Sequence, residues 1–192
     1  MKTRKSFLII YTLLAMVYML FFALPAFPDN KIEIMVTNSS VIVPADDSIS
    51  NRLLFKFDLP SSLNDKRIDY AEIDFYTKVD SLSSQSVMLT AYPLTTDWNK
   101  STASWSSPWG NSGGDFNDSL GEIGMVKSSG EEKVRLDITH MVERWQKQTL
   151  ANYGLVVFPL ETDRKIDSLE HHPGLASNVY AKVVIYFSYT HP

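Results

Sequence analysis

Residues 70–77 read YAEIDFYT, and two kinds of side chain alternate along them. Ala71, Ile73 and Phe75 face one side of an extended chain, because successive side chains of a strand point to opposite faces. The residues between them are acidic or carry a hydroxyl group. This period of two is typical of a β-strand with one buried face.

The same period recurs from residue 31 onward. We expect strands in segments that are rich in Val, Ile, Phe and Tyr and are bounded by Ser, Asn, Asp and Pro: 32–36, 41–43, 52–58, 70–77, 87–92, 133–138, 154–160 and 181–189. Short strands without the long spacing of βαβ units favour an antiparallel arrangement. The predicted fold class is therefore all-β, an antiparallel sandwich or jelly roll, with residues 31–192 forming a single domain.

One segment has a helical period instead. In DITHMVERWQKQ (137–148), apolar residues recur at i, i+3, i+4 and i+7 and form one face of a helix: Ile138, Met141, Val142 and Trp145. We expect one short helix over about 138–147. It would close one end of the sandwich, with Trp145 buried against Leu155 and Val157. The Ser-, Gly- and Asn-rich region 99–132 is predicted to be a long excursion between strands.

The N-terminal segment predicts export. MKTRK (1–5) is basic, residues 7–22 are almost wholly apolar, and Leu24-Pro25-Ala26 precedes a polar sequence. This order describes a signal peptide, residues 1–26, cleaved near Ala26. The apolar stretch is also long enough to span a bilayer as an uncleaved anchor. Both interpretations place the rest of the chain outside the cytoplasm, so the predicted location is secreted or cell surface.

Composition excludes several classes of partner and site. Without residues 1–26, Lys plus Arg falls from 18 to 15 against 22 Asp plus Glu, which gives a net charge of −7. An acidic surface disfavours nucleic acid as a partner. The sequence has no cysteine, so disulfides and thiolate zinc sites are excluded. A domain of this size must then be held together by its apolar core.

Three tryptophans lie within twelve residues of TTDWNKSTASWSSPWG (95–110): Trp98, Trp105 and Trp109. Indole rings can stack on the C–H faces of sugars while neighbouring Asn99 and Lys100 bind hydroxyl groups. Large aromatic side chains are also usually buried, so the rings can instead pin an irregular loop to the sandwich.

The position of each ring separates these two interpretations. Trp98 follows a strand edge directly, and we expect both Trp98 and Trp105 to turn inward. Pro108 biases Ser107 toward an extended conformation, and Gly110 follows, so Trp109 is predicted to lie at a projecting bend as the exposed ring. The candidate ligand-binding residues are therefore Trp109, Trp98, Trp105, Asn99 and Lys100.

Acidic residues near position 115 are a candidate calcium site. Asp115, Asn117 and Asp118 supply the oxygen atoms that calcium prefers, but their spacing is not that of an EF-hand. The alternative interpretation is a set of solvated loop charges. No other cofactor is expected.

Catalytic motifs are absent from the sequence. Neither G-x-S-x-G nor H-E-x-x-H occurs. His140 lies on the predicted helix, and the neighbouring His171 and His172 would point apart in a strand. We therefore expect a protein that is not an enzyme.

Four stretches, in their order along the chain, resemble the DNRLRE-domain family. They are NRLLFKFDLPSSL (51–63) with AEIDFY (71–76), then TTDWNKSTASWSSP (95–108), VRLDITHMVERWQKQTLANYGLVV (134–157) and AKVVIYFSY (181–189). The similarity covers roughly residues 40–190. The resemblance implies a jelly-roll sandwich of a kind found on secreted bacterial and archaeal proteins, some of them classed as carbohydrate-binding modules.

This resemblance and the three tryptophans of residues 95–110 predict an exported, non-catalytic module. We expect it to bind a cell-wall or extracellular polysaccharide. The alternative is a structural or adhesive surface domain without a sugar ligand. Exposure discriminates between them, since a sugar binder needs solvent-facing aromatic rings beside polar groups, whereas a spacer domain would bury all its tryptophans.

Overall fold

The computed structural model describes residues 30–79, 86–126, 131–162 and 164–189. The predicted signal peptide or anchor, residues 1–26, lies outside them. Among the described residues, no helix combines the length and apolar character needed to cross a membrane.

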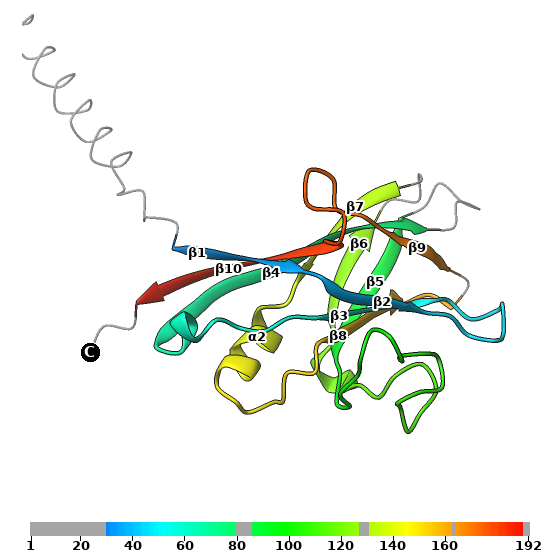
Figure 1. Ribbon diagram of the computed structural model, residues 1–192, viewed down its shortest axis with the longest axis horizontal. Coiled ribbons are helices and arrows are strands. Elements are labelled where there is room, and N and C mark those ends of the chain that lie inside the picture. Colours follow the sequence, from blue (N-terminus) through cyan, green and yellow to red (C-terminus); the bar gives the residue numbers. More distant parts are fainter. Residues whose placement is uncertain (1–29, 80–85, 127–130, 163, 190–192) are drawn as a thin grey trace, which may run out of the picture. The chain divides into compact units, whose positions relative to one another are not determined.

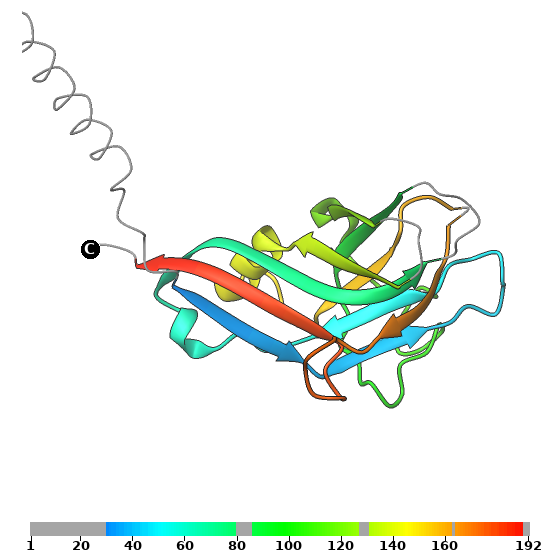
Figure 2. The same ribbon diagram turned by 90° about the horizontal axis from the view of Figure 1, so that it is seen from above.

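Two antiparallel sheets form the fold (Figure 1). In the described residues the first sheet has the order β1 (Lys31–Val36), β10 (Ala181–Tyr189), β4 (Lys66–Val79) and β7 (Glu131–Asp137), and β9 (Ile166–Glu170) also pairs with β4. The second sheet has the order β2 (Asn38–Ile42), β3 (Arg52–Lys56), β8 (Leu155–Pro159), β5 (Val87–Pro93) and β6 (Glu122–Val126). Figure 2 shows β10 lying between β1 and β4.

The strand order is that of the predicted jelly roll. The chain passes between the sheets at every connection except β2 to β3, β5 to β6 and β9 to β10. Most sequence neighbours are thereby separated, although β2 pairs with β3 and β5 with β6, and strands distant in the sequence pair, as β1 does with β10 and β3 with β8. The predicted all-β sandwich is confirmed.

The core lies between the sheets and follows the period of two. Phe55 of β3 and Phe75 of β4 are buried, and their ring centroids are 5.0 Å apart across the interface. Every second residue of the neighbouring strands joins them, including Ile73, Val183 and Ile185. Burial of this apolar area is the main stabilising term of the fold.

Helix α2 (Thr139–Gln146) corresponds to the predicted short helix. The Asp137 carboxylate accepts a hydrogen bond of 2.9 Å from the Thr139 amide at its start. Trp145 is buried, meets the Phe57 ring edge-on at 5.7 Å, and belongs to the same core cluster as Leu155 and Val157. The predicted burial of this helix face is confirmed.

Two strands were not expected from the sequence. β6 lies inside the region 99–132 that we predicted to be one excursion, and β9 lies in a polar segment. Gly124 interrupts the apolar pattern of β6, yet a Cβ atom there would lie 2.2 Å from Leu136 Cδ2 of the opposite sheet. The close approach of the two sheets leaves little room for a side chain at this position, which a local pattern cannot reveal. The described chain also has two short 3₁₀ helices, Ser61–Leu63 and Asp118–Leu120.

Candidate functional site

The tryptophan loop, residues 95–116, covers part of the outer face of the second sheet. Outward-facing Leu54 of β3 and Val156 of β8 are fully buried beneath it. They form a second apolar cluster, separate from the main core, with Ile42, Leu94, Trp98 and Trp109. Apolar residues on the outward side of neighbouring strands were the sequence signal that another segment covers this face.

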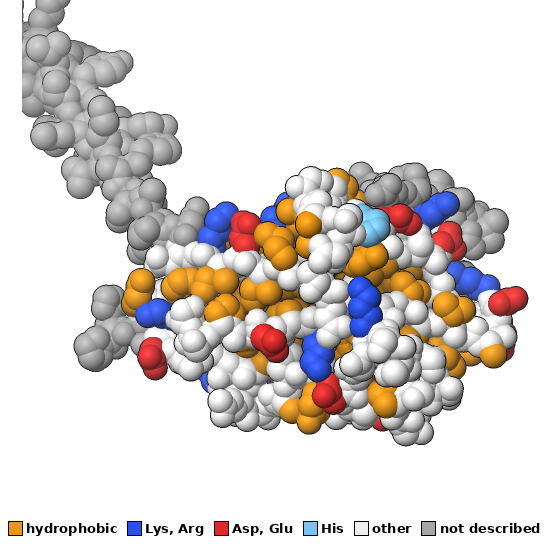
Figure 3. Space-filling view, viewed as in Figure 1, with side chains coloured by type: hydrophobic (Ala, Val, Ile, Leu, Met, Phe, Trp, Pro, Cys, Tyr) orange, Lys and Arg blue, Asp and Glu red, His pale blue; other side chains and the backbone are white. Residues whose placement is uncertain are grey.

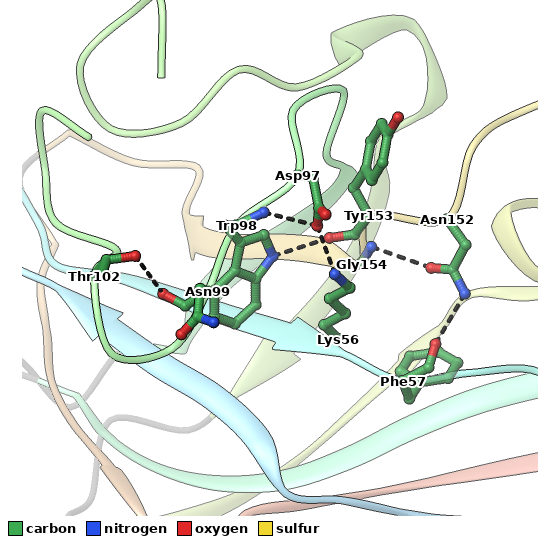
Figure 4. Close-up of polar contacts among 9 residues, drawn as sticks. All are labelled: Lys56, Phe57, Asp97, Trp98, Asn99, Thr102, Asn152, Tyr153 and Gly154. Carbon is green, nitrogen blue, oxygen red and sulfur yellow. Dashed lines mark hydrogen bonds and ion pairs between the residues drawn. The ribbon is translucent and has the colours of Figure 1, made fainter. Parts of the chain in front are cut away.

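Trp98 anchors the start of the loop (Figure 4). Its side chain is 5% exposed, and Nε1 donates a hydrogen bond of 2.9 Å to the Tyr153 carbonyl oxygen. Asn152 positions this segment, since its Nδ2 donates to the Phe57 carbonyl oxygen and its Oδ1 accepts from the Gly154 amide. Gly154 has a φ of 86°, and a Cβ atom there would lie 2.1 Å from the Phe55 carbonyl oxygen. The predicted inward position of Trp98 is confirmed.

The prediction that Trp109 is the exposed ring is wrong. Trp109 is 7% exposed and packs in the second cluster, and its Nε1 donates a hydrogen bond of 2.8 Å to the Ser104 carbonyl oxygen. The ring can bury its apolar surface over the sheet and satisfy its N–H group within the loop at the same time, which favours the inward position. A ring in this position offers no face to a sugar.

Trp105 is only partly buried, so the expected inward turn is incomplete. Arg52 lies beside it, with the guanidinium carbon 5.1 Å from the Trp105 ring and 4.3 Å from the Phe158 ring. Arg52 Nη1 donates a hydrogen bond of 2.7 Å to the Gly113 carbonyl oxygen. Burial lowers the pKa of Arg52 from its ordinary value. Arg52 therefore fastens the far side of the loop to the sheet.

A hollow of about 490 Å³ lies between the loop and the β2 edge of the second sheet. We call it the loop groove, and its lining residues are Asn38, Lys56, Asp97, Trp98, Asn99, Lys100, Thr102 and Pro108. Three of the predicted ligand residues, Trp98, Asn99 and Lys100, lie here together, whereas Trp105 and Trp109 do not line it. Sequence reasoning missed Asn38 and Lys56, because nothing in the chain indicates that β2 and β3 meet the loop at this point.

The charged groups of the loop groove are already paired. Lys56 Nζ lies 2.5 Å from Asp97 Oδ1, which also accepts a hydrogen bond from the Trp98 amide (Figure 4). The hydrogen bond from Lys56 is the main reason that the pKa of Asp97 is lowered. Lys100 Nζ donates to the Thr37 carbonyl oxygen at 3.2 Å and lies over the Tyr180 ring.

The two asparagine side chains of the groove differ in their hydrogen bonds. Asn99 Oδ1 accepts hydrogen bonds from the amide and the hydroxyl group of Ser101, so this side chain shapes the turn. The Asn38 side chain is half-buried and makes no hydrogen bond to another described residue. An amide offers two N–H donors and one acceptor oxygen. The Asn38 side chain therefore keeps its donors and its acceptor available in the groove.

The predicted calcium residues have structural roles. Asp115 accepts hydrogen bonds from the amides of Gly110 and Asn111, the Asn111 side chain and the Thr96 hydroxyl group, and the backbone bonds lower its pKa. Asn117 caps the second 3₁₀ helix by accepting from Ser119, and Asp118 lies in that helix. The described residues contain no group of three or more His, Asp or Glu side chains that could hold a metal ion. Calcium binding by Asp115, Asn117 and Asp118 stays a prediction, which melting temperatures with calcium and with chelator would test.

The histidines make separate structural contacts. His140 Nδ1 lies 2.9 Å from Glu122, and this hydrogen bond raises the pKa of His140. His172 is buried, with Nε2 2.7 Å from Asp74 Oδ1, and Lys133 Nζ lies 2.9 Å from the other oxygen of Asp74. The contact of His172 with Asp74 holds the segment after β9 to the first sheet.

The model of a known family matches most of this fold. Carbohydrate-binding module family 96 matches residues 31–173, from β1 to the segment after β9. The chain belongs to carbohydrate-binding module family 96. No curated protein matches the chain. The expectation of a carbohydrate-binding-module family is confirmed, although the match does not carry the DNRLRE name. Families of this class are binding modules rather than catalysts, in agreement with the expectation that the module is not an enzyme.

Proposed function

We propose that this module is exported and binds a cell-wall or extracellular polysaccharide in the loop groove. One observation supports the proposal. In a chain of a carbohydrate-binding-module family, the unpaired side-chain amide of Asn38 lines the same groove as the polar side chains of Asn99, Lys100 and Thr102. Asn and Lys side chains are suited to hydroxyl-rich ligands because they supply several donors and acceptors.

The groove favours recognition by hydrogen bonds rather than by ring stacking. Trp98 forms part of its wall but is almost fully buried, and its N–H group is already bonded to Tyr153. Its role is to hold residues 97–102 against β2 and β3. Fixed hydrogen-bonding groups at a preformed site lose little entropy on binding, which offsets the cost of displacing water from a polar ligand.

A binding assay with matched variants tests this function. The full-length protein is incubated with insoluble cellulose, chitin, xylan, mannan and an acidic polysaccharide, and the fraction retained is measured. We expect retention on at least one of them and, for Asn38→Ala, an affinity about fivefold lower, since one hydrogen bond contributes about 1 kcal/mol. The control Asn64→Ala changes an exposed asparagine outside the groove and should bind as the parent does. Retention on none of the polysaccharides would contradict the proposal.

Export is tested separately by the N-terminus of the protein recovered outside the cells. Cleavage near Ala26 would leave a chain that begins close to residue 27. A chain that remains in the cytoplasm would contradict export.

A structural or adhesive surface domain is the second candidate function. The observation that favours it is the burial of Trp98, Trp109 and Trp145, together with the partial burial of Trp105. A spacer domain needs its aromatic side chains for stability alone. The same retention assay separates the two functions, because a spacer domain binds none of the polysaccharides.

A further inference from the structure

A second hollow adjoins the loop groove. It has a volume of about 330 Å³ and is lined by Ile34, Met35, Thr37, Asn38, Lys56, Phe57 and Asp58. Asn38 and Lys56 line both hollows. The two hollows are therefore neighbours, and one pair of side chains stands between them.

The fold explains why these two residues stand together. Asn38 is the first residue of β2 and Lys56 is the last residue of β3, and the two are register partners in the second sheet. Residues directly opposite each other in an antiparallel pair project to the same face. At Thr37 the chain passes from β1 of the first sheet to β2 of the second, which places the end of β1 beside this pair (Figure 1).

The second hollow has apolar as well as polar lining residues. Met35, which is 41% exposed, and Ile34, which is half-buried against the main core, both line this hollow, and Asp58 supplies an exposed carboxylate. Figure 3 shows hydrophobic side chains next to side chains of Lys or Arg and of Asp or Glu on the face viewed in Figure 1. A sugar ring presents hydroxyl groups at its rim and C–H groups on its faces, and it needs both kinds of neighbour.

We propose that the two hollows bind an internal segment of an extended glycan chain, with consecutive sugar units on either side of the Asn38–Lys56 pair. This inference rests on the proposed function and specifies its ligand. The Asn38 amide lies between the two positions and can bond to groups on either unit. Met35 packs against a C–H face of the sugar in the second hollow, where burial of apolar surface contributes to affinity. A single sugar unit fills one hollow and leaves the other to water.

Chain length and one matched pair of variants test the proposal. Dissociation constants of the full-length protein are measured by calorimetry for cello-, chito-, xylo- and manno-oligosaccharides and oligouronates of one to six units. We expect affinity to rise from the monosaccharide until both hollows are filled and then to level off. Met35→Ala should weaken binding of the longest oligosaccharide about fivefold and leave the affinity for the shortest binding one unchanged. Met88 is similarly exposed, at 37%, but lies on β5 away from both hollows, so Met88→Ala should change neither.

The outcomes separate this inference from the proposed function. If polysaccharide is retained but the monosaccharide binds as tightly as the longest chain, the function stands and the two-hollow site is wrong. The same conclusion follows if Met35→Ala binds every length as the parent does, or if no oligosaccharide binds although polysaccharide is retained. If no polysaccharide is retained at all, both the function and this inference fail.

Discussion

Both buried indole N–H groups of the tryptophan loop have a backbone carbonyl partner within hydrogen-bonding distance. Trp98 bonds to Tyr153 across the sheet edge, and Trp109 bonds to Ser104 within the loop. Each ring also packs over Leu54 and Val156. Trp98 and Trp109 therefore hold the loop against the sheet, and polar residues of the loop line the groove.

Replacing Trp109 should destabilise the fold. We expect Trp109→Ala to lower the free energy of unfolding by about 3–5 kcal/mol, because a large buried ring leaves a cavity over the sheet. Trp105→Ala should cost less, since that ring is only partly buried. Denaturant unfolding measures both. An unchanged denaturation midpoint for Trp109→Ala would indicate that the Trp109 ring is exposed, as the sequence predicted.

Asp74 should give the protein an acid-sensitive contact. Burial by itself raises the pKa of Asp74, but hydrogen bonds from Lys133 and His172 outweigh it and leave the pKa lowered. The contact stabilises fully above the unfolded pKa of about 4, and the stabilisation is lost as pH falls through the lower folded pKa.

The Asp74→Asn variant tests this dependence. At neutral pH we expect a loss of about 3 kcal/mol, as for removal of one partner from a buried ion pair. The difference in unfolding free energy between parent and variant should narrow as the pH falls below about 4, where the unfolded carboxyl group becomes protonated. A difference that stays the same down to pH 3 would mean that the Asp74 carboxylate does not have a lowered pKa.

At the scale of single elements, α2 closes one end of the core through Trp145. Its ring meets Phe57 edge-on, while its Nε1 is buried without a hydrogen-bond partner among the described residues. The ring therefore stabilises the helix through packing rather than through its N–H group.

Two substitutions of Trp145 separate these contributions. Trp145→Ala should cost about 3–5 kcal/mol. Trp145→Phe should cost clearly less, because it keeps an aromatic ring near Phe57 and removes the unpaired N–H group. Thermal or denaturant unfolding of the two variants provides the measurement. Equal losses for Ala and Phe would show that the edge contact does not hold the helix.

Elements with a regular period could be predicted from the sequence, and those formed by tertiary contact could not. The alternation in YAEIDFYT and the i, i+3, i+4, i+7 spacing around Trp145 lie within a single element, so local reasoning found them. β6 carries Gly124 because the opposite sheet approaches closely, and β9 is a polar strand that pairs with β4. Neither cause is visible in a short window of sequence.

At the scale of the whole fold, the jelly-roll order brings β2, β3 and the tryptophan loop to one edge. The sequence predicted three residues of the loop groove, Trp98, Asn99 and Lys100, because they are neighbours along the chain. Asn38 and Lys56 come from strands far away in the sequence and meet the loop only through the strand order of the second sheet. Position along the chain also misled the prediction for Trp109, since the apolar outer face of that sheet decides which ring turns inward.

The most direct test of the account is to map the bound glycan by NMR. Amide spectra of the nitrogen-labelled protein are recorded with and without the oligosaccharide that binds most tightly. We expect the largest shift changes at Met35, Asn38, Lys56 and the segment 97–102, around the two hollows. Changes that instead gather around the hollow lined by Ile49, Phe158 and Leu160, or that leave residues 35–38 and 97–102 unaffected, would contradict the central claim that the loop groove is the carbohydrate-binding site.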